Sequence, residues 1–263
     1  MTQIQANRDF MKCPFPLGDS MKKSDQQAGV AHPPHGKPSV GNLISLKSFE
    51  TNCPVTNDSY KDLLDIRRSV RVYDENAPMT QEQLAFLLYS IQGIQSHRGS
   101  NSAFTLRPVP SGGARHPFEV YIAVRNVDGL EKGIYRYVPT ENIGGKAVTV
   151  EFLKNLDNHE EQIADMVVGQ RWVIAAPVVL FISCVPYKAE WRYVEHAHRI
   201  VLVDLGHVGQ NAMLSAVALG LGSCCLGAYN QQLCDQLLGL DGQDEYTVYG
   251  ISVGKETEKT ASA

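Results

Sequence analysis

The 263-residue chain lacks several of the features that define common classes of protein. Its first residues, MTQIQANRDFMKCPFPLGD, contain no continuous apolar segment, so no signal peptide is expected. The most apolar stretches are interrupted by Gly, His, Asp or Pro, and they fall short of a membrane span. A formal net charge of −4 gives no general electrostatic reason to bind nucleic acid or an anionic membrane. We therefore expect a globular protein with neither partner.

Pairs of cysteines and metal-binding motifs are also missing. The six cysteines form no C-x-x-C pair and no disulfide framework, which favours reduced thiols and a cytoplasmic location. The motif H-E-x-x-H is absent, and His196 and His198 stand two positions apart on an expected helix, where they point to nearly opposite faces. No metal is therefore expected. His207 is expected to be a buried histidine with satisfied hydrogen bonds.

Phosphate-binding fingerprints are absent in the same way. No G-x-x-x-x-G-K-[ST] sequence occurs, which excludes a P-loop. The glycine-rich stretch GLGSCCLG follows an expected helix, whereas a dinucleotide fingerprint follows a strand. Any nucleotide-like ligand must therefore be held by other residues.

What the sequence does contain divides into an arm and one larger domain. Residues 1–58 are rich in Pro, Gly, Ser, Lys and Asn, and AHPPHGKP can be neither a helix nor a central strand. We expect an extended arm that wraps a surface or a partner subunit, with free disorder as the alternative. Residues 59–263 form the expected globular domain.

Within that domain, helices are predicted early and late, around a few strands. SYKDLLDIRRSV opens a helix that Ser59 can cap, with Leu63, Leu64 and Ile66 on one face, and Thr80 begins a second helix with a capping box. Strands are predicted at FEVYIAVRNV, GIYRY, WVIAAPVVLFISCV and YTVYGISVGK. The longest helix is predicted at 190–220. Without strict βαβ alternation, an α+β fold is favoured over a doubly wound sheet.

A basic turn and a glycine-rich loop are the two candidate binding segments. RRSVR places Arg67, Arg68 and Arg71 within one turn, with the hydroxyl of Ser69 among them. Guanidinium groups suit phosphate oxygens, and a phosphate monoester with nearly two negative charges suits several cations. The alternative for this turn is solvated charge that compensates a helix dipole. In the loop 110–113, glycine lets the backbone approach a flat ligand closely.

Together these segments resemble the FMN-dependent nitroreductase superfamily, over residues about 60–255. The motifs occur in the family's order: R-R-S-x-R, P-S-x-x-x-x-x-P before a strand, DLGHVGQNAMLSAVALGLGS, L-G and a terminal V-G-K. The phrases VPSGGARHPFEVY, GIYRY, EWRY and LLGLDGQDE resemble its SagB-type dehydrogenase branch, which includes azoline oxidases. The resemblance implies a nitroreductase-like fold with a central, mainly antiparallel sheet flanked by helices. It also implies an intertwined homodimer with FMN at the interface, to which the apolar helix at about 199–220 would contribute.

The resemblance implies which residues hold FMN. Arg67 and Lys255 match positions that hold the phosphate, and Arg68 and Ser69 match flavin or ribityl contacts. Arg71 matches the cation near N1 and O2 of the isoalloxazine, where it would stabilise anionic reduced flavin. The remaining matches are Pro110, Ser111, Gly112 and Gly113 in the loop that covers the flavin from the other subunit, Asn211 beside the cofactor, and the backbone of Leu226 and Gly227 facing flavin N5.

The activity that the resemblance implies is hydride transfer through flavin N5. NADH or NADPH would be the donor, and a small or planar molecule the substrate, in a ping-pong cycle. The alternatives are a SagB-type dehydrogenase that oxidises a heterocycle in a modified peptide, and a flavin-binding protein without catalysis. A yellow colour of the purified protein would distinguish all three from an interaction module.

Arg192 and Tyr193 are the catalytic candidates. Azoline oxidases carry a Lys-Tyr pair near the start of the long helix, interpreted as the base of heterocycle oxidation, and the pair aligned with it here is Arg192-Tyr193. Because an arginine is not deprotonated in proteins, it cannot act as that base, although it could fix an anionic substrate or polarise a carbonyl. Tyr193 could donate a proton. Azoline oxidation is therefore the less favoured alternative.

Overall fold

The structure is a computed structural model that describes residues 2–12 and 23–257. At its centre is a seven-stranded sheet in the order β1-β6-β5-β4-β7-β9-β8, in which neighbouring strands are all antiparallel. The strands are β1 Asn42–Ser45, β4 Phe118–Val124, β5 Gly133–Tyr137, β6 Thr149–Lys154, β7 Val178–Cys184, β8 Gly222–Leu226 and β9 Tyr246–Gly254. A separate hairpin pairs β2 Ser96–Arg98 with β3 Phe104–Leu106.

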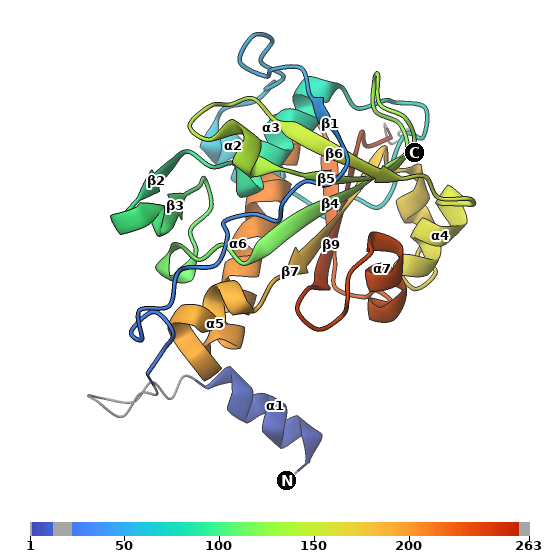
Figure 1. Ribbon diagram of the computed structural model, residues 1–263. Coiled ribbons are helices and arrows are strands. Elements are labelled where there is room, and N and C mark those ends of the chain that lie inside the picture. Colours follow the sequence, from blue (N-terminus) through green and yellow to red (C-terminus); the bar gives the residue numbers. More distant parts are fainter. Residues whose placement is uncertain (1, 13–22, 258–263) are drawn as a thin grey trace.

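Helices lie on both faces of this sheet, as Figure 1 shows. They are α1 Gln3–Met11, α2 Tyr60–Ile66, α3 Gln81–Gln92, α4 His159–Met166, α5 Tyr187–Tyr193, α6 Ala197–Ala218 and α7 Gln231–Leu238. Short 3₁₀ turns are η1 Ser100–Ser102, η2 Gly112–Ala114, η3 Pro139–Asn142, η4 Arg171–Ala175 and η5 Val194–His196. The prediction of an α+β fold with a mainly antiparallel sheet is confirmed.

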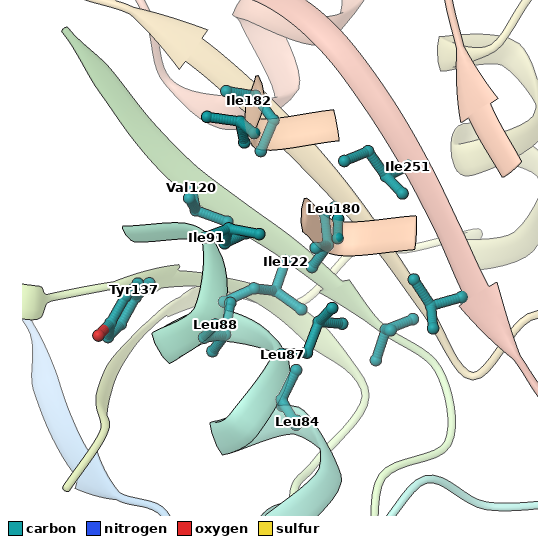
Figure 2. Packing of buried hydrophobic residues seen from close by; sticks show 14 of the residues in the cluster. Leu84, Leu87, Leu88, Ile91, Val120, Ile122, Tyr137, Leu180, Ile182 and Ile251 are labelled. Carbon is teal, nitrogen blue, oxygen red and sulfur yellow. The ribbon is translucent and has the colours of Figure 1, made fainter. Parts of the chain in front are cut away.

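The core lies mainly between the sheet and the helices α3 and α6. The predicted capping box at Thr80 is present and starts α3, whose leucines then point at the sheet. Figure 2 shows Leu84, Leu87 and Leu88 packed against Ile122 and its neighbours on the central strands. Each fully buried side chain of this kind contributes about 1.5–3 kcal/mol. The alternate residues of the same strands face the other way and pack on α4, η4 and α7.

The predicted apolar face of α2 is only partly buried. Ser59 caps this helix, as expected, by accepting a hydrogen bond from the amide of Asp62. Leu63 is buried, but Leu64 and Ile66 are 48% and 54% exposed. The apolar residues of α2 are therefore covered only at Leu63 in a single chain.

The long helix predicted at 190–220 is interrupted. α5 ends at Tyr193, and Val194 adopts φ 48° and ψ −126°, a conformation that a β-branched residue rarely takes. The segment 187–218 is apolar and long enough to span a membrane by composition and length alone. Half of the most apolar stretch of this segment is buried, however, and α6 packs on α3 and the sheet as a core helix does.

One stripe of α6 faces solvent. Leu202 and Val203 are 54% and 49% exposed, and Gly206 has no atom within 4 Å of the position a Cβ would take. His207 lies on the same stripe and is exposed, so the expectation that it is buried is wrong for a single chain. The apolar pattern predicted that these residues belong to a helix, but it did not show which side of that helix is covered.

Residues 23–45 of the arm lie along its own domain, from α5 to the edge strand β1, whereas α1 projects beyond α5 (Figure 1). Arg136 donates two hydrogen bonds of 2.9 Å to carbonyls within 37–41, and Glu151 accepts hydrogen bonds from two amides there. Lys37 forms an ion pair of 2.7 Å with Glu245. Buried charges thus hold the arm against β5 and β6. A domain boundary between residues 58 and 59 stays a prediction.

Candidate functional site

The basic turn after α2 runs directly beside β8. The amide of Val70 donates to the carbonyl of Ser223 at 2.9 Å, and Ser69 and Ser223 form a parallel bridge. A Cβ on Gly222 would lie 2.6 Å from Cγ2 of Val70, so the Val70 side chain packs on β8 here only because residue 222 is glycine. The backbone that carries the three arginines is therefore fixed at this edge of the sheet.

Lys255 reaches the same edge from β9. The amide of Asp74 donates to the carbonyl of Lys255 at 2.9 Å, and Tyr73 bridges Glu256. The hydroxyl of Tyr73 also donates to the carbonyl of Val70 at 2.8 Å and lies 2.8 Å from Oγ of Ser252, which ties the basic turn to β9. The structure thus brings to one edge of the sheet the two segments predicted to hold FMN, with Arg67 and Lys255 expected at its phosphate and Arg68, Ser69 and Arg71 at its ribityl chain or ring.

These cations have no anionic partner among the described residues. Arg67, Arg68, Arg71 and Lys255 form no ion pair with any carboxylate of 2–12 or 23–257. Arg68 donates to the carbonyl of Arg67 at 2.7 Å, and the guanidinium of Arg71 lies 5.9 Å from the ring centroid of Trp172. A pocket of about 460 Å³ opens beside Arg68, Ser69 and Gly222. Glu256 also lines this pocket, but the cations form no ion pair with a described carboxylate, which makes this edge suited to a phosphate.

The loop 110–113 is fastened to α6 by one buried carboxylate. Ser111 Oγ donates to Asp204 Oδ2 at 2.6 Å, and the amide of Gly112 donates to Asp204 Oδ1 at 3.1 Å. Ser111 Oγ in turn accepts from the amide of His116 at 2.9 Å. Burial raises the pKa of Asp204, and the hydrogen bonds from Ser111 and Gly112 oppose that rise. The loop is therefore held at a set position on α6.

The same loop packs on the two catalytic candidates. Gly113 has φ +58°, and a Cβ there would lie 2.6 Å from the hydroxyl of Tyr193 and 2.7 Å from Cδ of Arg192. Arg192 Nη1 donates to Oε1 of Gln26 in the arm at 2.7 Å. Its guanidinium lies 5.5 Å from the centroid of the Tyr193 ring. The structure thus brings together the loop and the pair Arg192-Tyr193, as well as the arm.

We expect Gly113→Ala to destabilise the protein by roughly 1–3 kcal/mol and to displace Arg192 and Tyr193. The substitution meets two costs, a left-handed backbone and the close contacts on the Cβ side. Gly239→Ala is the matched control, because Gly239 has φ +74° with no atom within 4 Å of its Cβ position. Urea denaturation of both variants separates the costs. Equal losses would contradict tight packing at Gly113.

The remaining predicted residues lie at the end of β8 and on α6. Leu226 is 3% exposed, while Gly227 is exposed and has no atom within 4 Å of its Cβ position, so a flat ligand can approach its backbone. Asn211 is turned to α3, where its Nδ2 donates to the carbonyl of Ser90 at 2.5 Å. That contact fixes the Asn211 side chain at the α3–α6 interface.

In one chain, the basic turn and the loop 110–113 stand at different levels of α6. Asp204 holds the loop, whereas Val217 lines the pocket beside Arg68 and Ser69. At a rise of 1.5 Å per residue, these two levels of α6 are roughly 20 Å apart. The residues predicted for one cofactor site therefore form two half-sites on a single chain.

Three residues that shape the half-site formed by the loop 110–113 and the pair Arg192-Tyr193 were not predicted. Asp204 and Gln26 act through hydrogen bonds to residues distant in sequence. Arg115 donates to the carbonyls of Gly113 and Ala103, and its guanidinium lies 4.9 Å from the centroid of the Trp191 ring. Only proximity to predicted motifs could have signalled Asp204 and Arg115. Within the described residues, no group of His, Cys, Asp or Glu could hold a metal ion.

Comparison with known proteins identifies the family of this chain. The family model described as the nitroreductase family matches residues 64–255. The chain belongs to the nitroreductase family and is an oxidoreductase of that family. It is 33% identical, over 198 residues, to a protein of Methanocaldococcus jannaschii that is named as a nitroreductase, covering 75% of this chain and 91% of that protein. The resemblance to the family is thereby confirmed.

Two proteins named for the processing of microcin B17 and of trifolitoxin are among the relatives. The microcin B17-processing protein McbC of Escherichia coli is 26% identical over 76% of this chain and 74% of its own. The trifolitoxin-processing protein TfxB of Rhizobium leguminosarum bv. trifolii is 30% identical over 51% of this chain and 36% of its own. These two relatives agree with the resemblance to the SagB-type branch.

Solved structures show the same fold. A nitroreductase of Anabaena variabilis has a TM-score of 0.62 and 25% identity, and the match covers 82% of this chain but only 42% of that one. A chain of the E. coli microcin synthetase McbBCD complex, solved with truncated pro-MccB17 bound, has a TM-score of 0.59 and 19% identity over 98% of this chain and 83% of that chain. A nitroreductase of Exiguobacterium sibiricum in complex with FMN has a TM-score of 0.54 and 14% identity over 79% and 93%.

Proposed function

We propose that this protein is an FMN-dependent oxidoreductase that transfers hydride between NADH or NADPH and a small or planar substrate. The observation that carries the proposal is the group of cations at the β8–β9 edge, Arg67, Arg68, Arg71 and Lys255, with no carboxylate partner in the described residues. Ser69 adds a hydroxyl to this group. The donors fit a phosphate monoester, and the exposed backbone at Gly227 fits a flat ring system.

A homodimer would join the two half-sites. Leu202 and Val203 of α6 and Leu64 of the neighbouring α2 are exposed apolar residues, and Gly206 leaves room for a close approach. A two-fold axis across the middle of α6 would exchange the ends of that helix between subunits. It would set the loop 110–113 of one chain against the basic turn of its partner. The interface would bury His207 as well as the apolar stripe.

In this proposal FMN, when bound, supplies two-electron hydride chemistry between the nicotinamide and the substrate. Arg67 and Lys255 would hold its phosphate, and Arg68 and Ser69 its ribityl chain or ring. Arg71 would place a positive charge at the pyrimidine side of the ring. On the other half-site, Tyr193 holds a proton on its hydroxyl beside the substrate. The nicotinamides are abundant in the cytoplasm, where we place the protein.

Oxidation of a heterocycle in a modified peptide is the second candidate. The relatives McbC and TfxB favour it, since their names assign them to the processing of microcin B17 and trifolitoxin. Arg192 disfavours it, because a guanidinium cannot serve as a base. Turnover of azoline peptides, compared with turnover of nitroarenes and quinones, would decide between the two.

The decisive experiment is FMN binding. The purified protein should be yellow or should gain flavin absorbance with added FMN, and NADH or NADPH should bleach that absorbance under anaerobic conditions. A colourless protein that takes up no FMN would refute both activities. A protein that binds FMN but reacts with neither nicotinamide would instead be a flavin-binding protein, or one reduced by its own substrate.

We expect Arg67→Ala to weaken FMN binding by about 10- to 100-fold, because a charge-assisted hydrogen bond to phosphate contributes about 1.5–3 kcal/mol. Fluorescence titration with FMN measures the change, and riboflavin serves as a second ligand that lacks the phosphate. Riboflavin binding should be nearly unaffected. Arg171→Ala, at an exposed arginine outside the site, is the control. Unchanged FMN affinity in Arg67→Ala would remove Arg67 from the phosphate site.

A further inference from the structure

Arg192 is fixed from three sides. Its stem lies against Gly113, where even a methyl group would collide with it, and its guanidinium lies over the ring of Tyr193. From the third side, Nη1 donates to Oε1 of Gln26 at 2.7 Å. The position of this guanidinium is therefore set jointly by the loop, by α5 and by the arm.

Gln26 is itself held in place by the end of α5. Its amide donates to the carbonyl of Trp191 at 2.9 Å, and the indole Nε1 of Trp191 donates back to the carbonyl of Val30 at 3.0 Å. The turn around Gln26 is closed by the amide of Val30, which donates to the carbonyl of Asp25 at 2.9 Å. The arm thus presents Gln26 to Arg192 on a rigid turn.

The hydrogen bond of Arg192 to Gln26 does not neutralise its charge. Its hydrogen-bond partner is a neutral amide, and no carboxylate of 2–12 or 23–257 forms an ion pair with it. The neighbouring carboxylates are engaged elsewhere: Asp25 accepts from the hydroxyl of Tyr187 at 2.8 Å, and Glu190 lies 2.8 Å from His198 Nε2. Asp204 accepts from the loop.

A second cation adds to this excess of positive charge. Arg115 lies close enough to Arg192 for their charges to interact: burial lowers the pKa of Arg115, and the charge of Arg192 lowers it further. Arg115 also has no carboxylate partner in the described chain, and it uses its donors on backbone carbonyls. Two guanidinium groups whose charges interact, neither of them in an ion pair with a described carboxylate, raise the local affinity for an anion.

We propose that Arg192, positioned by Gln26 of the arm, is the anion-binding residue of the substrate pocket, so that the substrate carries a carboxylate or a similar anionic group. The inference rests on the proposed function, because it takes the loop 110–113 to mark the substrate side of the flavin. A guanidinium has five N–H donors in a planar fork, and the bond to Gln26 uses one of them. The others can bind both oxygens of a carboxylate. Gln26 is a positioning residue, since it orients the fork without touching the substrate.

The test compares two ligands that differ mainly in charge, 4-nitrobenzoate and 4-nitrobenzamide. Both are titrated calorimetrically into the FMN-loaded protein at pH 7.5, where the acid is ionised. The wild-type protein should prefer the acid. Arg192→Gln should lower the affinity for the acid by about 10- to 100-fold and change the affinity for the amide by less than about twofold. Arg171→Gln, at an exposed arginine outside the site, should change neither.

Gln26→Glu tests the positioning role with an almost isosteric change. The new carboxylate would pair with Arg192 and satisfy its charge from within the protein. Affinity for the acid should then fall about tenfold or more, with the amide again unaffected and the melting temperature maintained. A purely structural role for Gln26 would alter both ligands together.

The outcomes separate this proposal from the proposed function. Flavin absorbance, recorded before each titration, reports whether FMN binds at all, so loss of that property would refute the proposed function and not the choice of ligand. With FMN bound, a wild-type protein without a preference for the acid would overturn the anion site. Equal weakening of acid and amide by Arg192→Gln would overturn it as well, because the guanidinium would then recognise a neutral group.

Discussion

Replacing Arg136 with methionine is expected to lower the free energy of unfolding by about 3–5 kcal/mol. The Arg136 guanidinium is 3% exposed and lies 2.6 Å from the fully buried carboxylate of Glu151, and 3.9 Å from that of Glu119. Methionine fills much of the same volume but leaves Glu151 buried without a cation. The carbonyls of Lys37 and Pro38 lose their donors at the same time. Urea denaturation at pH 7 measures the loss.

The loss should depend on pH in a defined direction. Burial opposes ionisation of Glu151, but hydrogen bonds from Arg136 and from two amides of the arm outweigh it and hold the pKa of Glu151 below its usual value of 4.5. A lowered pKa contributes stability above the unfolded pKa, and that contribution is lost as the pH falls through the folded pKa. In the variant, burial is less opposed and the pKa of Glu151 rises. The difference in free energy of unfolding between the wild type and Arg136→Met should therefore become smaller as the pH falls from 7 toward about 5.

Arg171→Met provides the matched control for this prediction. Arg171 forms an ion pair with Glu161 in which both side chains are 60% exposed, so water replaces the lost contact. Little change in stability is expected there. A deficit for Arg136→Met no larger than that of the control would show that the buried charges do not hold the arm.

The clamp on the arm illustrates what the sequence could not reveal. The composition of 1–58 indicated an extended arm, and a turn-rich segment of that kind can be recognised from Pro and Gly alone. Its docking depends on Arg136, Glu151 and Glu245, which lie about 100 to 200 positions away. Each of these charges, read by itself, is typical of a solvated surface. Only the sheet order brings them together.

Features that depend on residues close together in the sequence were predicted correctly. The capping box at Thr80 involves residues three positions apart, and the strand at FEVYIAVRNV has its own β-branched and aromatic pattern. The break at Val194 was missed, because nothing in WRYVEHAHR signals a positive φ at valine. Leu64 and Ile66 were predicted on one helix face with Leu63, but periodicity identifies an apolar stripe without showing what covers it, and both side chains are exposed.

The candidate site shows the same division. Spacing within RRSVR and the loop 110–113 predicted two groups of residues, and both groups exist. Their separation along α6 and the connection from Gln26 to Arg192 are properties of the fold. The family resemblance, with its homodimer, supplied the only indication that the groups belong to one site. The role of each residue there remains a prediction for the experiments above.

Asp204→Ala is expected to destabilise the protein by about 2–4 kcal/mol and to free the loop 110–113. Asp204 is 4% exposed and accepts hydrogen bonds from Ser111 Oγ and from the amide of Gly112. Alanine would leave both donors without an acceptor in a mostly buried region. A double-mutant cycle with Ser111→Ala, followed by urea denaturation, isolates the pair, because the two losses should not add. Additive losses would mean that the hydrogen bond of 2.6 Å contributes little.

The Asp204 variant also carries a signature in pH and one in cofactor binding. Burial raises the pKa of Asp204 above its usual 3.8, against the hydrogen bonds from Ser111 and Gly112. A raised pKa contributes stability that is fully present below the unfolded pKa and is lost as the pH rises through the folded pKa. The free energy by which the wild type is more stable than Asp204→Ala should therefore increase as the pH falls from 7 toward about 4. If the loop covers the flavin of the partner subunit, the variant should also bind FMN more weakly, although Asp204 itself faces the loop. FMN affinity that is unchanged in a folded Asp204→Ala protein would separate the loop from the cofactor site.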